Sequence, residues 1–379
     1  MTGKKILLVA TVQSHIAQFH QPLIEWLESE GHTVDVAARD NMAEKPSLHL
    51  AVSGTVYNIP FARSPFSLRN PGAYRALRKL IKTGEYDVVH CNTPVGGILS
   101  RMAARRLRKK GKLTVVYEAH GFHFFRGGSR KNWLLWYPIE RWFSRYTDLL
   151  ITINQMDFSL AKEKFKAKRV EHIPGVGLDL SRFESARKEA SLREEFGLGE
   201  ETRIVFSVGE LNQNKNHRVI LEALAHLDDP HIHYFLAGNG PLREELEALA
   251  RSLGIAENVH FLGYRRDIPS LLKNADVYAF PSLREGLGMA SIEAMAAGLP
   301  LVTSDRHGIN DYSEHGKTGF KYAPHDARGF AEGIRTLLDD EAMREEMGEY
   351  NKAVSARFTI DASMARMKEI YGGILSHEG

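Results

Sequence analysis

The chain has 379 residues, more than one hydrophobic core usually serves, so its length predicts two domains. Hydrophobic residues make up 43% and charged residues 26%, proportions that exclude a disordered protein, a collagen and a coiled-coil rod. The single cysteine, Cys91, cannot form an internal disulfide, which excludes a stapled secreted scaffold and favours a reducing compartment. No apolar run approaches the roughly 18 residues that a membrane-spanning helix needs. We therefore expect a cytoplasmic protein whose apolar start is a buried strand.

The net charge of +3 conceals an asymmetry along the chain. Residues 1–185 carry 28 Lys and Arg against 16 Asp and Glu, whereas residues 186–379 carry 22 against 31. The two halves are therefore expected to have different partners. We expect no nucleic-acid partner for the basic half, because it contains no zinc-finger spacing, aromatic ribonucleoprotein motif or helix-turn-helix.

Short β-branched apolar runs alternate with longer amphipathic stretches, a pattern typical of parallel sheets covered by helices on both faces. In the first half, strands are expected at 5–10, 33–38, 56–59, 86–91, 113–118, 148–153 and 169–173, and helices at 18–30, 71–83, 95–110, 131–146 and 155–165. In the second half, strands are expected at 203–208, 232–237, 259–262, 277–280 and 300–303, and helices at 216–225, 241–253, 268–274, 289–297 and 327–339. A Pro/Gly-containing and then charged segment at 175–189 predicts the linker between them. The fold class is thus α/β, with two doubly wound domains in tandem.

Three motifs suggest sites that their context does not support. Residues 315–318 resemble the end of a P-loop, but Asp311 stands where its first Gly belongs, so a tight turn is expected. The turn at 238–240 is followed by Arg243 where a dinucleotide fingerprint has its third Gly, which disfavours a nicotinamide dehydrogenase. A metal cluster of Glu118, His120 and His123 has no standard spacing, and we expect no metal and no cofactor.

The most informative segment spans residues 280–300. Pro281 ends a predicted strand, and two glycines then open a helix, where they allow a ligand to approach the backbone closely. The first N–H groups of that helix and its positive end predict a cradle for a diphosphate. Glu285 lies just before the helix and Glu293 lies about a turn and a half along it. Carboxylates at these positions suit the hydroxyl groups of a ribose or a sugar.

This segment resembles the Glu-x7-Glu signature of the retaining nucleotide-sugar glycosyltransferases of family four. Residues 238–242 match the Gly-x-Gly-Pro-Leu turn of that family, and residues 261–264 match its nucleobase strand. The turn expected at 13–15 and the stretches at 119–122 and 208–211 resemble the capsular or exopolysaccharide branch. The resemblance covers essentially the whole chain and implies the GT-B fold, with two Rossmann-like domains facing across a cleft. It places an acceptor-binding domain at 1–180, a nucleotide-sugar domain at 190–355 and a helix at 360–376 that packs back on the first domain.

The resemblance also implies roles for individual residues. Lys215 would contact the diphosphate, Glu293 the ribose diol and Glu285 the hydroxyls of the donor sugar, while Glu210 replaces the usual arginine. His120 would lie beside the reacting sugar, although a satisfied histidine at a strand end is the alternative. The implied catalytic set is His120, Lys215 and Glu285, and the implied donor-binding set is Ser14, His15, Gly209, Glu210, Lys215, Gly238, Asn239, Tyr264, Glu285, Gly286, Leu287, Gly288, Met289 and Glu293.

The basic half offers a surface for anionic lipid. Residues 101–112 contain seven Lys and Arg and no acid, and residues 130–145 interleave aromatic and basic side chains. Aromatic residues suit the depth of lipid headgroups, and cations are attracted to anionic lipid. We expect peripheral docking on the inner face of the cell membrane; the alternative is a solvated basic helix beside core tryptophans.

Together the motifs and the family resemblance imply a retaining, metal-independent glycosyltransferase of cell-surface polysaccharide biosynthesis. It would move a sugar from a nucleotide donor, most simply a UDP-sugar, to a glycan or a polyprenyl-diphosphate-linked acceptor. Two alternatives remain open. One is a nucleotide-sugar epimerase or hydrolase of the same fold. The other is a non-catalytic nucleotide-sugar-binding subunit, which the carboxylate of Glu210 at an arginine position favours.

Overall fold

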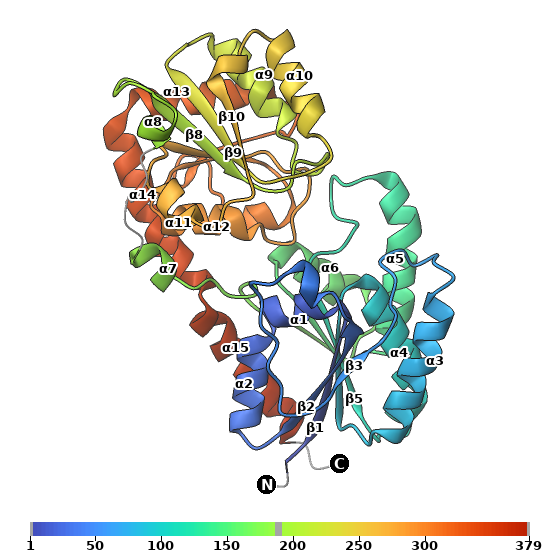
Figure 1. The fold of residues 1–379 in the computed structure, drawn as a ribbon. Coiled ribbons are helices and arrows are strands. Elements are labelled where there is room, and N and C mark those ends of the chain that lie inside the picture. The colour runs from blue at the N-terminus through green and yellow to red at the C-terminus, as the bar shows by residue number, and fades with distance from the viewer. Residues whose placement is uncertain (1–2, 186–191, 377–379) are drawn as a thin grey trace. The chain divides into compact units, whose positions relative to one another are not determined.

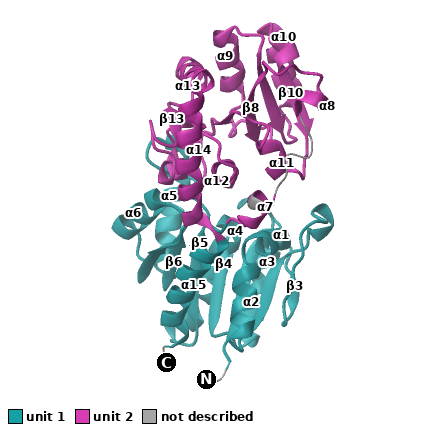
Figure 2. Cartoon of the chain, turned by 90° about the vertical axis from the view of Figure 1, so that its left-hand side faces the viewer, with its two compact units in different colours: residues 1–177, 360–379 teal, residues 178–359 magenta. Residues whose placement is uncertain are grey.

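The computed structural model describes residues 3–185 and 192–376 (Figure 1). Contacts within the chain divide it into two compact units (Figure 2). Unit 1 comprises Met1–Gly177 and Ile360–Gly379, and unit 2 comprises Leu178–Thr359. The boundary falls within the linker predicted at 175–189. Residues 186–189 of that linker, and 190–191 of the predicted second domain, lie outside the described part.

Unit 1 is built on a seven-stranded parallel sheet in the order β3-β2-β1-β4-β5-β6-β7. Its strands are β1 (Lys5–Val12), β2 (Thr33–Arg39), β3 (Val56–Asn58), β4 (Val88–Asn92), β5 (Thr114–Ala119), β6 (Leu149–Thr152) and β7 (Arg169–His172). Its helices are α1 (Gln13–Phe19), α2 (Gln21–Ser29), α3 (Asn70–Thr83), α4 (Pro94–Lys109), α5 (Arg130–Ser144), α6 (Gln155–Lys164) and α15 (Ile360–Leu375). The central strands are buried along their length, because helices cover both faces of the sheet.

Unit 2 repeats this plan with a six-stranded parallel sheet in the order β10-β9-β8-β11-β12-β13. Its strands are β8 (Arg203–Val208), β9 (Ile232–Ala237), β10 (Val259–Gly263), β11 (Val277–Phe280), β12 (Leu301–Ser304) and β13 (Gly319–Tyr322). Its helices are α7 (Ser181–Glu184), α8 (Leu192–Glu195), α9 (Arg218–Leu227), α10 (Arg243–Ser252), α11 (Ile268–Leu272), α12 (Met289–Ala296), α13 (Ala327–Asp339) and α14 (Glu341–Ser355). In each unit the strand order reverses beside the first strand, between β1 and β4 and between β8 and β11. Ligands of doubly wound sheets bind beyond the carboxyl ends of the strands at such a reversal.

Two expectations about secondary structure were wrong, and two further elements were missed. The helix expected at 18–30 is two helices, because the chain breaks at His20 (φ −122°, ψ 3°) and α2 begins at Gln21 with Pro22 in its first turn. The turn expected at 13–15 is the first turn of α1, which follows β1 directly. Strand β13 and helix α14 were not predicted. The turn expected at 315–318 is confirmed by the backbone hydrogen bonds of Lys317 and Thr318 to the carbonyl oxygen of Glu314.

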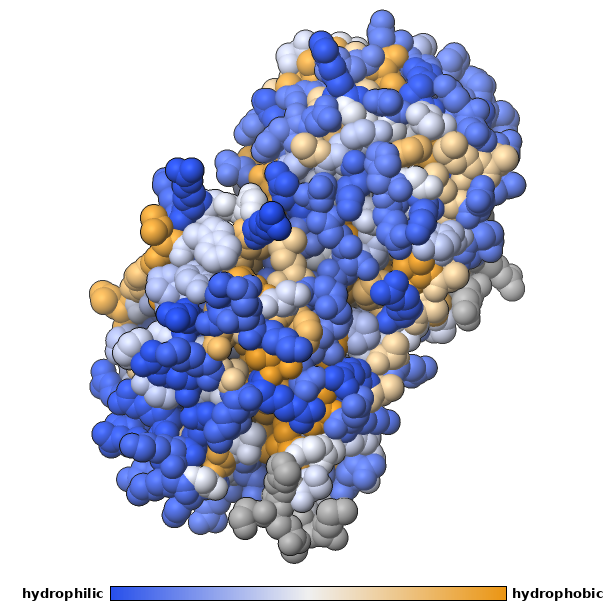
Figure 3. Space-filling view, turned by 180° about the vertical axis from the view of Figure 1, so that it is seen from behind, coloured by the Kyte–Doolittle hydropathy of each residue, from blue (hydrophilic) through white to orange (hydrophobic). Residues whose placement is uncertain are grey.

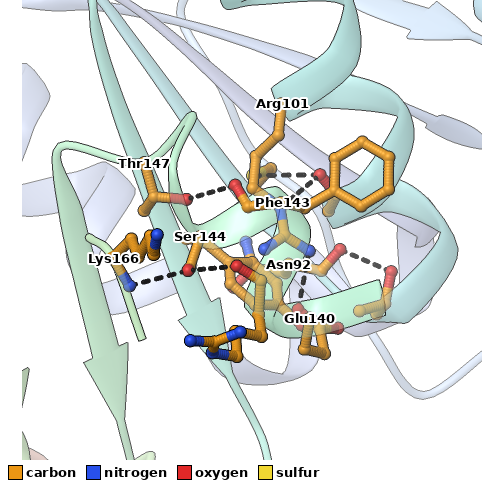
Figure 4. Close-up of polar contacts among 12 residues, drawn as sticks. Asn92, Arg101, Glu140, Phe143, Ser144, Thr147 and Lys166 are labelled. Atoms are coloured by element: carbon orange, nitrogen blue, oxygen red, sulfur yellow. Dashed lines mark hydrogen bonds and ion pairs between the residues drawn. The ribbon is translucent and has the colours of Figure 1, made fainter. Parts of the chain in front are cut away.

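A buried ion pair joins α4 to α5 in unit 1 (Figure 4). The Arg101 guanidinium is 1% exposed, and its Nη2 donates to Oε2 of Glu140 over 2.9 Å. Its Nε donates to the carbonyl oxygen of Gly97, and its Cζ lies 3.9 Å from the ring centroid of Tyr117. Arg101, the first of the seven cations in 101–112, therefore belongs to the interior and not to the basic surface.

Candidate functional site

The centre of the candidate donor site in unit 2 is an ion pair between the loops that follow β8 and β11. Nζ of Lys215 lies 2.7 Å from Oε1 of Glu285, and the two side chains are 20% and 14% exposed. The ammonium also lies 4.8 Å from the ring centroid of Phe280, the last residue of β11. Because β8 and β11 flank the strand-order reversal, the sheet brings together two residues that are 70 positions apart in sequence.

Side-chain hydrogen bonds fix the two loops against each other. Nδ2 of Asn214 donates to the carbonyl oxygen of Arg284 over 2.9 Å, and the Leu283 amide donates back to the Asn214 carbonyl oxygen over 2.8 Å. Nδ2 of Asn216 donates to the carbonyl oxygen of Pro281 over 3.1 Å. The Lys215–Glu285 pair is thus held by backbone contacts on both sides and does not depend on two flexible side chains alone.

Glycines make room for the lysine at the same sheet edge. A Cβ on Gly209 would lie 3.1 Å from Cε of Lys215, so the lysine stem lies across the Gly209 backbone. A Cβ on Gly238 would lie 1.9 Å from the carbonyl oxygen of Gly209, a clash that leaves room only for glycine at this position. The loops after β8 and β9 therefore pack backbone to backbone, and the Leu211 amide donates to the Asn239 carbonyl oxygen over 3.0 Å.

Helix α12 begins directly after the glycine-rich loop. Its N-cap is Gly288 in the left-handed region (φ +91°), where a Cβ would lie 2.8 Å from both Phe280 and Tyr312. The first amides of a helix have no partner within it, and the helix dipole makes that end positive. Glu293 lies within α12 and is half-buried. Burial raises the pKa of its carboxyl group, although the charge of Arg182 opposes that shift.

Two predicted donor residues lie apart from this cluster. Glu210 is exposed, and its carboxylate accepts a hydrogen bond from Nδ2 of Asn212 over 3.0 Å. Tyr264 follows β10 and is 64% exposed. Both follow carboxyl ends of strands in the same sheet as Lys215, and Gly263 before Tyr264 accepts a hydrogen bond from the Gly238 amide over 2.7 Å.

The predicted residues of unit 1 gather in a histidine cluster after β1 and β5. The ring centroids of His15 and His120 are 4.6 Å apart, and His20 lies 5.6 Å from each. Burial lowers the pKa of His15 well below its usual value and that of His20 to about 4, so both rings are neutral near pH 7. His120 is the more accessible ring beside the carboxylate of Glu118, with 17% of its side chain exposed.

A buried carboxylate lies behind these rings. Oε1 of Glu118 lies 3.0 Å from Nε2 of His120, and its Oε2 lies 3.2 Å from Nε2 of His90. Burial alone would raise the pKa of Glu118, but the surrounding imidazoles of His20, His120 and His90 hold it well below the usual range. Glu118 is therefore ionised near neutral pH.

The remaining predicted residue of unit 1, Ser14, is already engaged. Its amide donates to Oδ1 of Asn41 over 3.0 Å, and its hydroxyl accepts from Nδ2 of Asn41 over 2.9 Å. A ligand would have to displace Asn41 to reach either group. His123, which we grouped with Glu118 and His120, instead stacks on Trp136 with centroids 4.7 Å apart.

Sequence reasoning missed His20 and His90 because they lie on different elements from His120. Parallel pairing brings His90 close to Glu118, because β4 pairs with both β1 and β5 and His90 lies opposite Val116, two residues before Glu118. His20 lies at the break between α1 and α2, with its ring centroid 5.7 Å from that of His90. The one signal present in the sequence was His90, a histidine within an apolar run predicted to be a buried strand. Among the described residues, His15, His20 and His120 are also a group whose ring nitrogens, within 4.8 Å of one another, could hold a metal ion.

The comparisons with known proteins agree with both units. Residues 188–354 match the family model described as glycosyl transferases group 1, and residues 21–182 match that of glycosyltransferase family 4. The putative glycosyltransferase EpsD of Bacillus subtilis is 39% identical over 377 residues, covering 98% of this chain and 97% of that protein. The chain belongs to glycosyltransferase family 4.

A second relative of this glycosyltransferase has a more specific name. It is the UDP-Gal:alpha-D-GlcNAc-diphosphoundecaprenol alpha-1,3-galactosyltransferase of Escherichia coli, which is 29% identical over 304 residues and covers 78% of each chain. Among solved structures, Anabaena HepE in complex with UDP and glucose has a TM-score of 0.77 at 22% identity, covering 98% of this chain and all of that one. Sucrose-phosphate synthase of Thermosynechococcus elongatus has a TM-score of 0.80 at 20% identity, covering 98% and 99%. The predicted GT-B fold is confirmed.

The surface of the glycosyltransferase is mixed in character. Within residues 3–185 and 192–376, no helix is long and apolar enough to cross a bilayer. Figure 3 shows one face on which hydrophilic residues predominate and apolar residues form separate groups among them. On α5, Leu134 is 80% and Trp142 52% exposed, whereas Trp133 and Trp136 pack against the core. Of the seven cations in 101–112, five are exposed on or just after α4: Arg105, Arg106, Lys109, Lys110 and Lys112.

Proposed function

We propose that this glycosyltransferase is a retaining, metal-independent enzyme of exopolysaccharide biosynthesis. Its donor would be a UDP-sugar and its acceptor a glycan or a polyprenyl-diphosphate-linked sugar. The observation that carries the proposal is the Lys215–Glu285 pair at the carboxyl ends of β8 and β11, directly before the amino end of α12. A relative named for a UDP-galactose donor and a diphosphoundecaprenol acceptor supports the substrate class.

Charge development explains what this pair and helix would do. Cleavage of a sugar–phosphate bond leaves negative charge on the departing diphosphate and positive charge on the sugar ring. Donors already aimed at the developing anion stabilise that transition state without reorganising. The Lys215 ammonium and the first amides of α12 supply such donors, so we propose that no divalent cation is required. Activity that survives EDTA at full rate would support this, and activity restored only by added metal would contradict it.

The carboxylates would orient the donor. Glu285 would accept hydrogen bonds from the sugar hydroxyls, and Glu293 would accept them from the ribose diol. His120 would contact the reacting sugar from unit 1. We propose front-face attack with the leaving phosphate taking the acceptor proton, which requires no second carboxylate at the fixed separation that glycosidases use. The anomeric configuration of the product, read by NMR, tests retention.

The exposed cations on and just after α4 and the exposed apolar residues of α5 would dock unit 1 on an anionic membrane that presents the lipid-linked acceptor. Each cation near such a surface contributes about 1 kcal/mol. Flotation with vesicles of anionic phospholipid should recover the protein, and neutral vesicles should recover much less. Replacing Arg105 and Lys109 together by Gln should reduce recovery on the anionic vesicles. Equal recovery on both kinds of vesicle would remove the docking proposal.

The enzymatic proposal is tested by incubating UDP-glucose, UDP-galactose and UDP-N-acetylglucosamine separately with GlcNAc-diphosphoundecaprenol. Release of UDP with a matching extended lipid is the expected result for one of the donors. Epimer formation without acceptor would favour the epimerase alternative. Binding of UDP without any turnover, across further lipid-linked acceptors, would favour the non-catalytic subunit.

A further inference from the structure

The candidate catalytic histidine rests on a buried polar chain that ends on the C-terminal helix. Oε1 of Glu118 lies 3.0 Å from Nε2 of His120, and Oε2 lies 3.2 Å from Nε2 of His90. Nδ1 of His90 lies 2.7 Å from the hydroxyl of Tyr371 on α15. Glu118, His90 and Tyr371 are all at most 1% exposed, so water does not compete for these contacts.

We propose that Glu118 is the positioning residue of His120, fixing its ring orientation and its tautomer so that Nδ1 is the nitrogen offered to substrate. The inference rests on the proposed role of His120 in sugar transfer. Glu118 itself touches no substrate in this account; it acts through the histidine.

The proton positions follow from the chemistry of the groups. An ionised carboxylate only accepts, so an imidazole nitrogen 3.0–3.2 Å from its oxygens carries the hydrogen. In the proposed arrangement Nε2 of both His90 and His120 carries a hydrogen, which leaves Nδ1 of each ring as the acceptor. The Tyr371 hydroxyl, whose pKa burial raises well above its usual value, donates to Nδ1 of His90. One assignment thus gives each group of the chain a donor or acceptor role that is complementary to its neighbour.

The alternative of a passive buried carboxylate fits the site less well. Burying an ionised carboxylate is unfavourable unless hydrogen bonds compensate for the lost water. Neither ring N–H aligns well with its oxygen, although the distances are short. Contacts of this kind often tighten when substrate binds. A carboxylate held ionised beside a partly exposed histidine is the arrangement that orients a working imidazole.

The first measurement needs no variant. In protein labelled with ¹⁵N histidine, the ring nitrogens of His120, assigned by comparison with His120→Ala, should show a protonated Nε2 and an unprotonated Nδ1 at neutral pH. The reverse tautomer, or a rapidly exchanging mixture, would overturn the inference. This readout is independent of activity, so it stands even if the proposed function fails.

The second measurement uses Glu118→Gln, which keeps the shape but can accept from only one of the two histidines. In the UDP-release assay, kcat should fall about 10- to 100-fold with KM for the donor changed less than about threefold. The double variant with His120→Ala should be no slower than His120→Ala alone, because Glu118 acts through that ring. Glu171→Gln, which removes an arginine-paired carboxylate from β7, is the matched control and should stay within about twofold.

These measurements distinguish failure of the proposed role of His120 in sugar transfer from failure of the proposed positioning role of Glu118. If His120→Ala keeps full turnover, the proposed role of His120 fails, and the tautomer measurement alone decides on Glu118. If His120→Ala is inactive while Glu118→Gln has wild-type kcat, or if the two losses multiply, Glu118 is not the positioning residue. Metal bound in stoichiometric amount and lost in His15→Ala would also overturn the inference, because the rings would then be ligands.

Discussion

Nζ of Lys215 and Oε1 of Glu285 lie 2.7 Å apart at the carboxyl edge of the unit 2 sheet. The carboxylate pairs with the ammonium and holds it at the sheet edge. An arriving diphosphate would compete with Glu285 for that ammonium. A sugar hydroxyl would then donate to Glu285 the hydrogen bond that the ammonium no longer supplies. The pair therefore links nucleotide binding to sugar binding, and its two members should respond differently to substitution.

Lys215→Ala should weaken UDP binding roughly 10- to 100-fold, the scale of one lost charge-assisted hydrogen bond of about 1.5–3 kcal/mol. Titration calorimetry with UDP measures it directly. Lys317→Ala is the matched control, since Lys317 lies in the P-loop-like turn, where it pairs with Glu314. Equal losses in both variants would show that the effect is one of net charge and not of position.

Glu285→Gln should have the opposite effect on UDP. Without the carboxylate, the ammonium is free for phosphate, so UDP should bind at least as tightly as in the wild type. Turnover of the UDP-sugar should nevertheless fall by about 10²-fold or more, if the sugar hydroxyls lose an ionised acceptor. Glu332→Gln, at an exposed carboxylate of α13 outside the predicted site, should change neither quantity. A Glu285→Gln variant with weaker UDP binding and normal kcat would contradict the assignment.

Glu293 should make stability depend on pH. Because burial raises its pKa in the folded protein, its contribution is fully present below the carboxyl pKa of the unfolded chain and is lost as pH rises through the raised value. The Glu293→Gln variant has no ionisable group at this position and therefore does not lose stability in this way as pH rises. The melting temperature of the variant relative to wild type should therefore increase from pH 4 to pH 8. A difference that stays flat, or falls, would mean that Glu293 is solvated in the folded protein.

Arg101 and Arg105 lie in the same basic run, but their substitution should have different effects on the free energy of unfolding. Arg101→Ala leaves Glu140 buried without its ion-pair partner, which should cost about 3–5 kcal/mol of unfolding free energy. Arg105→Ala, at an exposed position, should cost less than about 0.5 kcal/mol. Denaturant titration of both variants provides the comparison, and similar midpoints would contradict the buried pair.

Much of the fold followed from hydrophobic pattern, because a parallel sheet buries its strands on both faces and leaves continuous apolar runs. The elements that were missed have weaker patterns. Strand β13 is only four residues long and includes Lys321, and the break at His20 divides a stretch that has helical spacing throughout.

The donor cluster was accessible from sequence because its members follow strand ends within recognisable motifs. The histidine cluster was not, since it depends on the register of β1, β4 and β5, which no local pattern specifies. The contact of Asn41, whose Oδ1 accepts a hydrogen bond from the Ser14 amide, could not be predicted from a local pattern either. Sequence named His15 and His120 separately; only the fold places them 4.6 Å apart.

The most direct test of the central claim is a structure of the protein with UDP bound. We predict phosphate oxygens within hydrogen-bonding distance of Nζ of Lys215 and of the backbone amides at 286–289. A pocket of about 500 Å³ lies in unit 1 at the amino ends of its strands, and its charged lining residues are Lys4, Lys112, Lys168, Arg169, Asp87 and Asp148. A diphosphate bound there, or anywhere away from α12, with Lys215 still paired to Glu285, would contradict the account.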